Sequence, residues 1–279
     1  MKLSVVTTVY NRPEHFRLFL HALALQSRRP DEVVVGDDGS DAPVAARLET
    51  LLATSGFAGK VVHQPKNGFR AAAARNLALR EVTGDYVVFA DCDIALLPDA
   101  LALHESIGGP GHLLAGNRVL LSKTQTDAFF AAPAPGPGLD ALVRAYGEAD
   151  QTELHEAARL FAQHARRRRW HLARPHKPKL LGCHFSLTMA DIRRVNGFDE
   201  NFVGWGYEDD DFARRLYKVG IRPVSVIESA HALHLWHPSL APVAGGRHRD
   251  RANRAYFRRW FVPAYCRNGL QKTTPESLL

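Results

Sequence analysis

The sequence has few cysteines and no long apolar run. Its three cysteines, Cys92, Cys183 and Cys266, lie far apart and form no Cys-x-x-Cys pair. This spacing provides neither a disulfide framework nor a thiolate metal site. No stretch of about 18 apolar residues occurs, so we expect no transmembrane span, and the apolar run 3–9 is too short for a signal-peptide core. We therefore expect a cytoplasmic protein that can contact the inner face of the membrane peripherally.

The composition is that of an ordinary globular protein with a basic excess. Of 279 residues, 46% are hydrophobic and 23% are charged, enough for one large α/β domain or two small ones. Lysine and arginine outnumber aspartate and glutamate by 36 to 29, giving a net charge of +7. This charge suits a diphosphate, an anionic polymer or a membrane surface. It does not choose among them, and a merely soluble basic protein has the same composition.

Two segments concentrate the basic residues. The run Arg166 to Arg169 is typical of a solvated helix face. Residues 247–267 mix arginine with tyrosine, phenylalanine and tryptophan, a pattern that can bind lipid headgroups or an anionic acceptor. The same pattern also fits a packed terminal helix, so the sequence leaves both interpretations open.

The first hundred residues alternate between short β-rich runs and helical runs. The runs 3–9, 31–36, 60–63 and 85–90 predict strands, and the segments between them carry apolar residues at helical spacing or are rich in alanine. Alternation of this length predicts right-handed βαβ units around a parallel sheet. Further on, 139–165 is predicted to be helical, 221–227 a strand, and the Pro/Gly-rich run 131–138 a loop.

Polar residues accumulate where three of the predicted strands end. They are Thr8 and Tyr10, then Asp37 and Asp38, then Asp91 and Asp93. In open parallel sheets, ligands bind in the crevice outside the carboxyl ends of the strands. Aspartate merely punctuating a turn explains any one of these cases, but it explains all three less well. The sequence therefore predicts one ligand-binding crevice at this edge.

Asp91-Cys92-Asp93 and a later glycine-tryptophan loop are the candidates for chemistry. Two carboxylates after a buried strand invite a divalent cation, which can bridge a diphosphate. The run Gly204-Trp205-Gly206-Tyr207 permits a tight turn and leads into four acids, residues 208–211, at the start of a predicted helix. One or two acids would satisfy the helix dipole, so the cluster favours a carboxylate placed against a substrate hydroxyl.

Three histidines follow the predicted strand 221–227. They are His231, His234 and His237, and a lone histidine at such a place is more often a packing or surface residue. Three within seven residues, in a chain with an Asp-x-Asp pair, favour a metal-ligand role. Neutral imidazole binds Mn²⁺ but suits Mg²⁺ poorly.

Taken in order, these motifs resemble a known enzyme family. Residues 4–12, Asp37-Asp38-Gly39-Ser40, Ala74-Arg75-Asn76 and Asp91-Cys92-Asp93 resemble the family 2 inverting glycosyltransferases of GT-A fold. Residues 204–210 resemble the acceptor and catalytic loop of β-1,4-galactosyltransferases and chondroitin-polymerase domains, although Tyr207 stands where that loop commonly has glycine. The resemblance implies a single catalytic domain with a mixed, mostly parallel sheet flanked by helices.

The resemblance also implies roles for individual residues. Those expected to hold the donor nucleotide are Thr8, Tyr10, Asp38, Arg70, Arg75 and Asp91. Asp93 is expected to bind the metal, Mn²⁺ or Mg²⁺, with His237 and with His234 as a second histidine ligand, and the sequence does not decide between the two histidines. Asp209 matches the catalytic base, and Glu208 its acceptor-orienting neighbour. Trp205 and Gly206 are expected to contact the acceptor.

The implied organisation is one domain with two halves and a tail. Residues 1–100 form the donor half, 101–245 the acceptor and catalytic half, and 246–279 a basic, aromatic C-terminal extension. The implied activity is metal-dependent transfer of a hexosyl or N-acetylhexosaminyl group from a nucleotide sugar, most simply UDP-linked, to a glycan or glycolipid hydroxyl, with no nucleic-acid partner. Two rivals remain: a nucleotidyltransferase, which would carry a glycine-rich loop after its first strand, and a non-catalytic nucleotide- or glycan-binding module.

Overall fold

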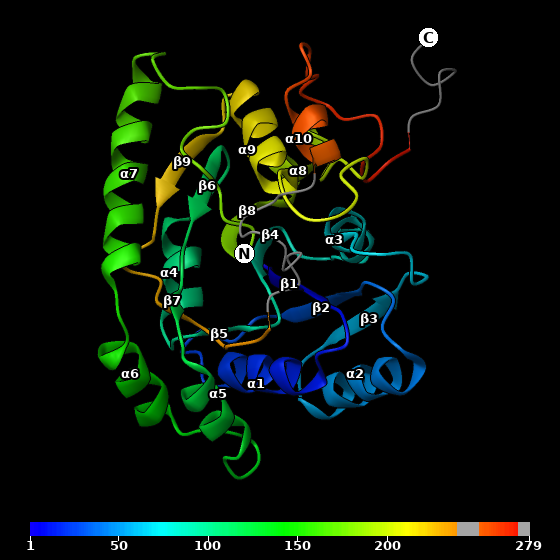
Figure 1. The fold of residues 1–279 in the computed structure, drawn as a ribbon, viewed down its shortest axis with the longest axis vertical. Helices are drawn as coiled ribbons and strands as arrows, with labels where there is room; N and C mark the ends of the chain where they lie inside the picture. The colour runs from blue at the N-terminus through cyan, green and yellow to red at the C-terminus, as the bar shows by residue number, and fades with distance from the viewer. Residues whose placement is uncertain (239–250, 273–279) are drawn as a thin grey trace.

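The computed structural model describes residues 1–238 and 251–272. Its centre is a seven-stranded sheet in the order β3-β2-β1-β4-β8-β6-β9 (Figure 1). The strands are β1 (Leu3–Val9), β2 (Glu32–Asp37), β3 (Gly59–His63), β4 (Tyr86–Ala90), β6 (His112–Ala115), β8 (His184–Thr188) and β9 (Arg222–Ser225). The first four are mutually parallel, β8 runs antiparallel to both β4 and β6, and β9 is parallel to β6. The predicted mixed, mostly parallel α/β sheet is confirmed.

Alternating residues of the central strands feed two hydrophobic cores on opposite faces of the sheet. Val6, Val34 and Phe89 point to one face, where helices α3 (Ala71–Leu79), α8 (Met189–Arg194) and α9 (Glu208–Lys218) supply partners. On the other face, α1 (Pro13–Ala24), α2 (Ala42–Thr54) and α4 (Ala100–Ile107) cover neighbours such as Val5 and Val33. Burial on both faces explains why these strands read as continuous apolar runs.

A second, three-stranded sheet was not predicted from the sequence. It has the order β5-β10-β7 and joins Ile94–Leu96 (β5), Ala232–His234 (β10) and Val119–Leu120 (β7). Strand β5 starts directly after Asp93, and β10 pairs with it antiparallel, with His234 opposite Ile94. This small sheet therefore brings the histidine segment beside the Asp-x-Asp segment.

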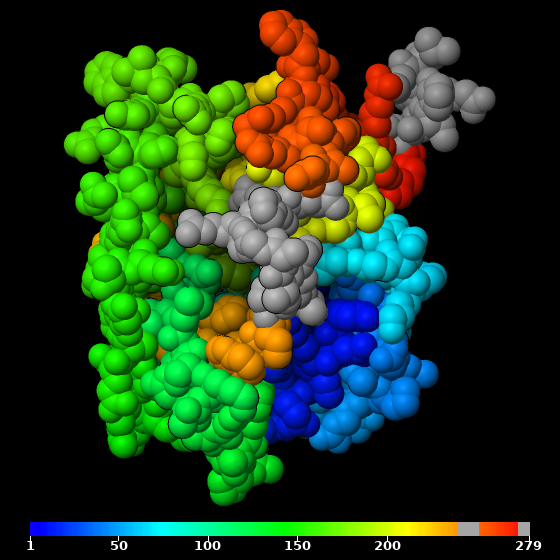
Figure 2. Space-filling model, in the orientation of Figure 1, coloured from blue at the N-terminus to red at the C-terminus, as the bar shows by residue number. Residues whose placement is uncertain are grey.

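The middle of the chain is helical, as predicted for 139–165, although it forms two helices. These are α6 (Leu139–Glu148) and α7 (Thr152–Arg169), preceded by α5 (Lys123–Phe130). The run Arg166 to Arg169 is the last turn of α7, which stands along one side of the molecule in Figures 1 and 2. No described helix is long and apolar enough to cross a membrane.

Part of the predicted C-terminal extension packs on the domain. Helix α10 (Arg251–Phe257) lies against α9, and Arg214 of α9 donates a hydrogen bond to the Phe257 carbonyl (2.7 Å). Asn253, which is buried, donates to the carbonyl of Gly206 at 3.1 Å. The predicted domain boundary near residue 245, and the last residues 273–279, lie outside the described residues.

Candidate active site

A cleft of about 440 Å³ lies at the carboxyl ends of β1, β2 and β4. Of the thirteen residues expected to act, eleven line it: Thr8, Tyr10, Asp38, Arg75, Asp91, Asp93, Trp205, Glu208, Asp209, His234 and His237. The two others, Arg70 and Gly206, lie beside the cleft and are absent from its lining. Segments separated by more than 200 residues of chain therefore converge on one cavity, as the strand ends predicted.

The turn after β2 holds one aspartate for structure and one for the cleft. Asp37 accepts hydrogen bonds from the backbone N–H of Ser40 (3.1 Å) and from its hydroxyl, and so closes the turn. Asp38 lines the cleft and accepts the backbone N–H of Arg70 at 2.8 Å. Burial raises the pKa of Asp38, against the opposing effect of that hydrogen bond. Arg70 thus contributes its backbone N–H, which holds Asp38 at the cleft.

Asp93, His234 and His237 form a cluster that can hold a metal ion. One ligand atom from each lies within 4.8 Å of the others. His237 Nε2 is 3.1 Å from Asp93 Oδ2, and His234 Nε2 is 3.7 Å from Oδ1. The small sheet sets this geometry, because Leu235 N–H donates to the Asp93 carbonyl at 2.8 Å. Asp93 Oδ1 is buried and has no hydrogen-bond partner among the residues that the structure describes.

Burial and nearby charge together favour an ionised Asp93 and a neutral His234. Burial opposes ionisation of Asp93, but the hydrogen bond from His237 and nearby positive charge outweigh it and lower the pKa of the carboxyl. Burial also lowers the pKa of His234 to about 4. Metal ligands must be deprotonated in this way: carboxylate and neutral imidazole.

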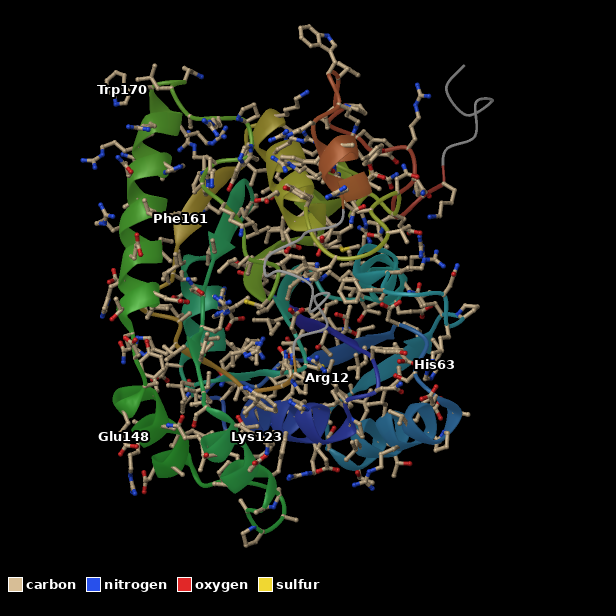
Figure 3. The ribbon with its side chains drawn as sticks, viewed as in Figure 1. Arg12, His63, Lys123, Glu148, Phe161 and Trp170 are labelled. Atoms are coloured by element: carbon tan, nitrogen blue, oxygen red, sulfur yellow. The ribbon has the colours of Figure 1, made fainter. Side chains whose placement is uncertain are left out.

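Arg12, which lies near the middle of the molecule at the start of α1 (Figure 3), was not predicted as a site residue. Its guanidinium donates to Asp93 Oδ2 at 2.7 Å and lies 2.9 Å from His237 Nδ1. Arg118, which follows β6, also lines the cleft. The sequence signal for Arg12 was its place directly after β1, where it was taken only as part of a turn. For Arg118 no local signal exists.

Arg75 is a buried guanidinium that three carboxylates surround. Nη1 lies 2.8 Å from Asp209 Oδ1 and 3.7 Å from Glu208 Oε1, and Nη2 lies 3.2 Å from Asp91 Oδ1. Nη2 also donates to the Gly182 carbonyl at 3.3 Å. Arg75 therefore links Asp91, which follows β4, to the acid cluster at the start of α9. This linking place differs from the expected contact with base or diphosphate, although Arg75 does line the cleft.

Glu208 and Asp209 sit in different surroundings although they are adjacent. Asp209 accepts from Arg75 on Oδ1 and from the Gly182 N–H on Oδ2 (3.0 Å), and its side chain is 24% exposed. Glu208 is buried, and within the described part of the chain its Oε2 has no hydrogen-bond partner. Burial and the charge of Asp209 raise the pKa of Glu208 to about 8, with Arg75 opposing. A carboxyl whose pKa is raised toward neutrality is a common feature of acid–base sites.

The loop before α9 adopts the tight turn that its glycines predicted. Gly204, Gly206 and Tyr207 have φ of +82°, +98° and +76°. The left-handed conformation at Tyr207 is one that glycine adopts at no steric cost, which accounts for the glycine common at this place in the galactosyltransferase loop. The Tyr207 ring stacks on Phe257 with centroids 5.0 Å apart, and Gly204 N–H donates to the Phe69 carbonyl at 2.8 Å.

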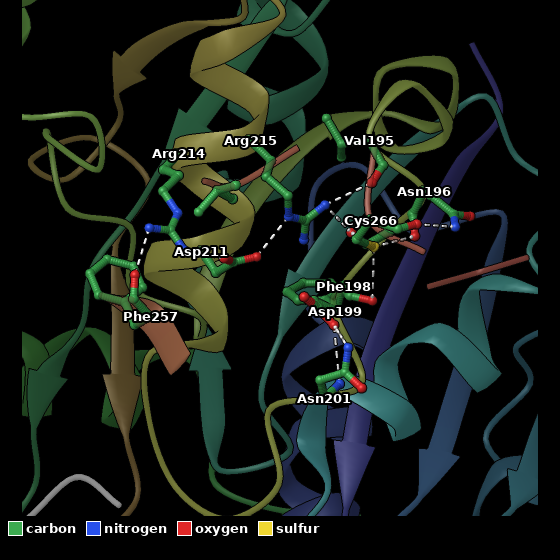
Figure 4. Close-up of polar contacts among 12 residues, drawn as sticks. Val195, Asn196, Phe198, Asp199, Asn201, Asp211, Arg214, Arg215, Phe257 and Cys266 are labelled. Carbon is green, nitrogen blue, oxygen red and sulfur yellow. Dashed lines mark hydrogen bonds and ion pairs between the residues drawn. The ribbon is translucent and has the colours of Figure 1, made fainter. Parts of the chain in front are cut away.

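A buried ion pair fixes α9 behind the acids (Figure 4). Asp211 and Arg215 are both fully buried, with Nε 2.7 Å from Oδ2. Arg215 Nη1 donates to the carbonyls of Val195 (2.7 Å) and Gly197 (2.9 Å), in the loop after α8. Because this carboxylate is paired inside the core, Asp211 supports the helix and takes no part in the cleft, unlike Glu208 and Asp209.

Comparisons with known proteins agree with this geometry. Residues 4–104 match the model of Glycosyl transferase family 2, and 164–238 match the model of the N-terminal domain of galactosyltransferase. The second match contains both the glycine-tryptophan loop and the histidine segment. Among solved structures, a mannosyltransferase from Pyrobaculum calidifontis in complex with GDP-Man and Mn²⁺ superposes with a TM-score of 0.56 at 19% identity, covering 88% of this chain and 58% of that one.

A second solved structure has a similar fold, and two curated proteins are similar in sequence. TarS residues 1–349 of S. aureus, in complex with UDP-GlcNAc, gives a TM-score of 0.56 at 18% identity, covering 86% of this chain and 60% of that chain. Validoxylamine A glucosyltransferase of Streptomyces hygroscopicus subsp. limoneus is 32% identical over 84% of this chain and 52% of its own length. Hyaluronan synthase of Pasteurella multocida is 28% identical over 78% of this chain but 23% of its own length.

The chain thus spans about half or less of the length of these two curated relatives. The chain belongs to glycosyltransferase family 2, has the GT-A fold, and carries a galactosyltransferase-type segment in its second half.

Proposed function

We propose that this chain is an inverting glycosyltransferase that moves a sugar from a nucleotide sugar to an acceptor hydroxyl, with Asp209 as the base and a divalent metal on Asp93, His234 and His237. One observation carries the proposal: the metal-type cluster and the acid pair Glu208–Asp209 line the same cleft. A nucleotide- or glycan-binding module has no need for both. A nucleotidyltransferase would need a glycine-rich loop after β1, where this chain has Tyr10-Asn11-Arg12-Pro13.

The three expected metal ligands, Asp93, His234 and His237, fit a divalent cation. One carboxylate and two imidazoles, with a buried carboxylate oxygen lacking a partner, are ligands that Mn²⁺ accepts well and Mg²⁺ poorly. When bound, such an ion neutralises charge that develops on the leaving diphosphate. Arg12 and Arg118 line the same side of the cleft and can bind the phosphate oxygens, Arg12 bidentately if it leaves Asp93.

The acid pair supports a division of roles. Asp209 keeps a lone pair on each oxygen after accepting from Arg75 and Gly182, and it is partly exposed to the cleft. It takes the proton of the acceptor hydroxyl. Glu208, protonated near neutral pH because of its raised pKa, donates a hydrogen bond from its buried carboxyl and orients the acceptor.

The reaction is one displacement. The acceptor oxygen bonds to the anomeric carbon while its proton passes to Asp209, and the bond from that carbon to the diphosphate oxygen breaks, with the electron pair leaving on the nucleoside diphosphate. Attack opposite the leaving group inverts the anomeric configuration. Arg75 holds Asp209 in place for this step through the 2.8 Å contact.

We further propose a UDP-linked hexose or N-acetylhexosamine donor and a glycan or glycolipid acceptor. Tyr10 and Asp38 line the donor side of the cleft, where an aromatic ring can stack on a base and a carboxylate can accept a base N–H. Trp205 lines the cleft together with the acid pair, and its side chain is 43% exposed. It offers a flat apolar face of the kind on which sugar rings lie.

The decisive experiment measures nucleoside-diphosphate release from a panel of nucleotide sugars with Mn²⁺, with and without acceptor sugars. Asp209→Asn should lower kcat about 10²- to 10⁴-fold, the usual contribution of a general base, and leave donor binding intact. Asp93→Ala should remove the Mn²⁺-dependent thermal shift caused by the donor, because a ligand stabilises only the state that binds it. Asp127→Asn, an exposed aspartate paired with Lys123 on α5, is the matched control.

The product's anomeric configuration, determined by NMR, tests inversion separately. Full transfer activity in Asp209→Asn would show that another group is the base. Incubation with a nucleoside triphosphate and a sugar 1-phosphate tests the nucleotidyltransferase, since release of pyrophosphate from that pair, with no nucleoside-diphosphate release from nucleotide sugars, would favour it. Binding of nucleotide sugars without turnover on any acceptor would favour the binding module.

A further inference from the structure

One end of the molecule combines basic charge with projecting apolar side chains. Two segments meet there, 166–179 at the end of α7 and 251–262 around α10, and we call them together the basic aromatic edge. They contain seven and four lysines and arginines, respectively, and no acidic residue. This total exceeds the net charge of +7 of the whole chain. Positive charge is therefore concentrated on this edge and is not spread evenly over the surface.

The two segments lie side by side along α9. The ring of His176 contacts that of Phe257, with centroids 5.4 Å apart. Arg168 lies over the ring of Tyr217 of α9 at 4.2 Å, and Lys218, the last residue of that helix, lies 5.4 Å from the ring of Phe261. In Figures 1 and 2 both segments stand at the upper edge of the molecule. They form one surface.

The apolar residues of this edge are unusually exposed. Trp170 is 73% exposed, Leu172 75%, Trp260 103% and Phe261 71%, the four highest values among the large hydrophobic side chains of the described residues. Figure 3 shows Trp170 at the upper end of α7, directed away from the domain. Tryptophan, with an apolar body and a polar N–H, is the side chain most typical of membrane–water interfaces.

The arginines divide into a supporting and an outward group. Arg168 donates to the carbonyls of Lys177 (2.6 Å) and Arg174 (2.9 Å), and Arg259 pairs with Asp199 at 3.3 Å, so these two hold the edge together. The outward group is exposed to solvent: Arg166, Arg167, Arg169, Arg174, Arg254 and Arg258. Exposed tips of tryptophan, leucine and phenylalanine ringed by arginine match an anionic lipid surface, which accepts apolar side chains between its headgroups. A soluble polyanion offers the negative charge but no apolar layer that the exposed side chains can enter.

We propose that the basic aromatic edge docks this protein on an anionic lipid bilayer, with Trp170, Leu172, Trp260 and Phe261 entering the headgroup region. Arg168 and Phe261 of the edge contact Tyr217 and Lys218 at the C-terminal end of α9, about 16 Å along the helix from Glu208 and Asp209 at its N-terminal end. Asn253 and Phe257 reach Gly206 and Tyr207, beside the acid pair. Contact with the bilayer is therefore assigned to the four exposed apolar side chains and not to Asn253 or Phe257. This proposal does not depend on the proposed transferase activity, because that activity is measured with soluble acceptor sugars and without vesicles.

Vesicle co-sedimentation of the full chain tests this. Wild-type protein should bind vesicles of phosphatidylcholine mixed with phosphatidylglycerol, bind pure phosphatidylcholine far less, and dissociate as NaCl is raised. Changing Arg166, Arg167 and Arg169 to glutamine should weaken binding about 100-fold, since each such residue contributes about 1 kcal/mol. Changing Trp170, Leu172 and Trp260 to serine should weaken it by about tenfold or more.

Matched controls separate docking from folding and from total charge. Arg29, Arg47 and Arg144, changed together to glutamine, remove the same charge elsewhere, and Leu139→Ser with Val143→Ser removes exposed apolar residues from α6. Both controls should bind vesicles like wild type. All edge variants should keep their thermal stability and their nucleotide-sugar binding.

Three results would overturn the proposal. They are no sedimentation of wild-type protein with anionic vesicles at low salt, equal binding to neutral and anionic vesicles, and edge variants that bind like wild type. Binding to a sulfated polysaccharide without binding to vesicles would also overturn it, and would identify a polyanion as the ligand of this edge.

Discussion

Replacing Arg75 by methionine tests the role of the buried guanidinium most directly. Its side chain is 6% exposed, and it is the ionic partner of Asp91, Glu208 and Asp209. Removing one partner of a buried ion pair typically costs about 3–5 kcal/mol, because the opposite charge stays buried. Asp91 and Asp209 keep 32% and 24% of their side-chain exposure, which lets water reach them, so we expect the lower end, about 3 kcal/mol.

The assay is urea denaturation, in which the midpoint falls while the slope stays constant if only stability changes. Arg80→Met is the control: Arg80 directly follows the same helix, its side chain is 35% exposed, and its partner Glu200 keeps a second cation, Lys272. Its loss should cost about 1 kcal/mol or less. The double variant Arg75→Met/Asp209→Asn should recover part of the lost stability, with a coupling of about 0.5–3 kcal/mol.

The pH dependence of Arg75→Met should have a defined sign. Without the guanidinium, the pKa of Glu208 rises further, because burial and the charge of Asp209 then act unopposed. A carboxyl whose folded pKa is raised contributes stability that is present at low pH and is lost as pH rises. Arg75→Met should therefore be closest to wild type in acid. Stability within 1 kcal/mol of wild type at neutral pH, or strict additivity in the double variant, would refute the charge-linking role.

Three further predictions concern single residues. Because the folded pKa of Glu208 is about 8, against 4.5 for a free glutamate, wild-type stability should fall relative to Glu208→Gln as pH rises between those values; denaturation at a series of pH values checks this, and a constant difference would contradict it. Burial lowers the pKa of His184 to about 4, so the stability of the wild-type protein should fall as pH falls from 6.5 toward 4. The loss should be at most about 3 kcal/mol relative to His184→Gln. If both proteins lost stability equally in acid, this role of His184 would be excluded. A Cβ at Gly182 would lie 2.4 Å from both carboxylate oxygens of Asp209, so Gly182→Ala should lower kcat about 10²-fold in a folded protein, whereas unchanged kcat would remove Asp209 from the mechanism.

The parts of the fold that were predictable depend on local signals. Strands β1, β2 and β4 are continuous apolar runs because both faces of the sheet are covered, and each is followed by the polar residues that mark its end. The cleft followed from a general rule about where such strands end. The acid-rich start of α9 was equally visible, because two glycines and four acids lie within eight residues.

What the sequence did not predict depends on contacts between distant segments. The small sheet consists of strands of two or three residues, too short to show a pattern. Arg12 and Arg118 line the cleft only because β1 and β6 end near it. The contact between Arg75 and Gly182 joins residues separated by 107 positions, so no local pattern indicates it. A single arginine in a sequence gives no indication of which carboxylates it will meet.

The strained turn at Tyr207 depends on contacts from the segment that follows residue 250. A non-glycine residue in the left-handed conformation costs about 1–3 kcal/mol and persists only when its surroundings hold it. Helix α10 supplies those contacts: Phe257 stacks on the Tyr207 ring, and Asn253 donates to the carbonyl of Gly206. Since the next residue after Tyr207 begins the helix that presents Glu208 and Asp209, these contacts set where both carboxylates point. A glycine at this position would adopt the turn without help, so tyrosine makes the orientation of the acid pair depend on α10.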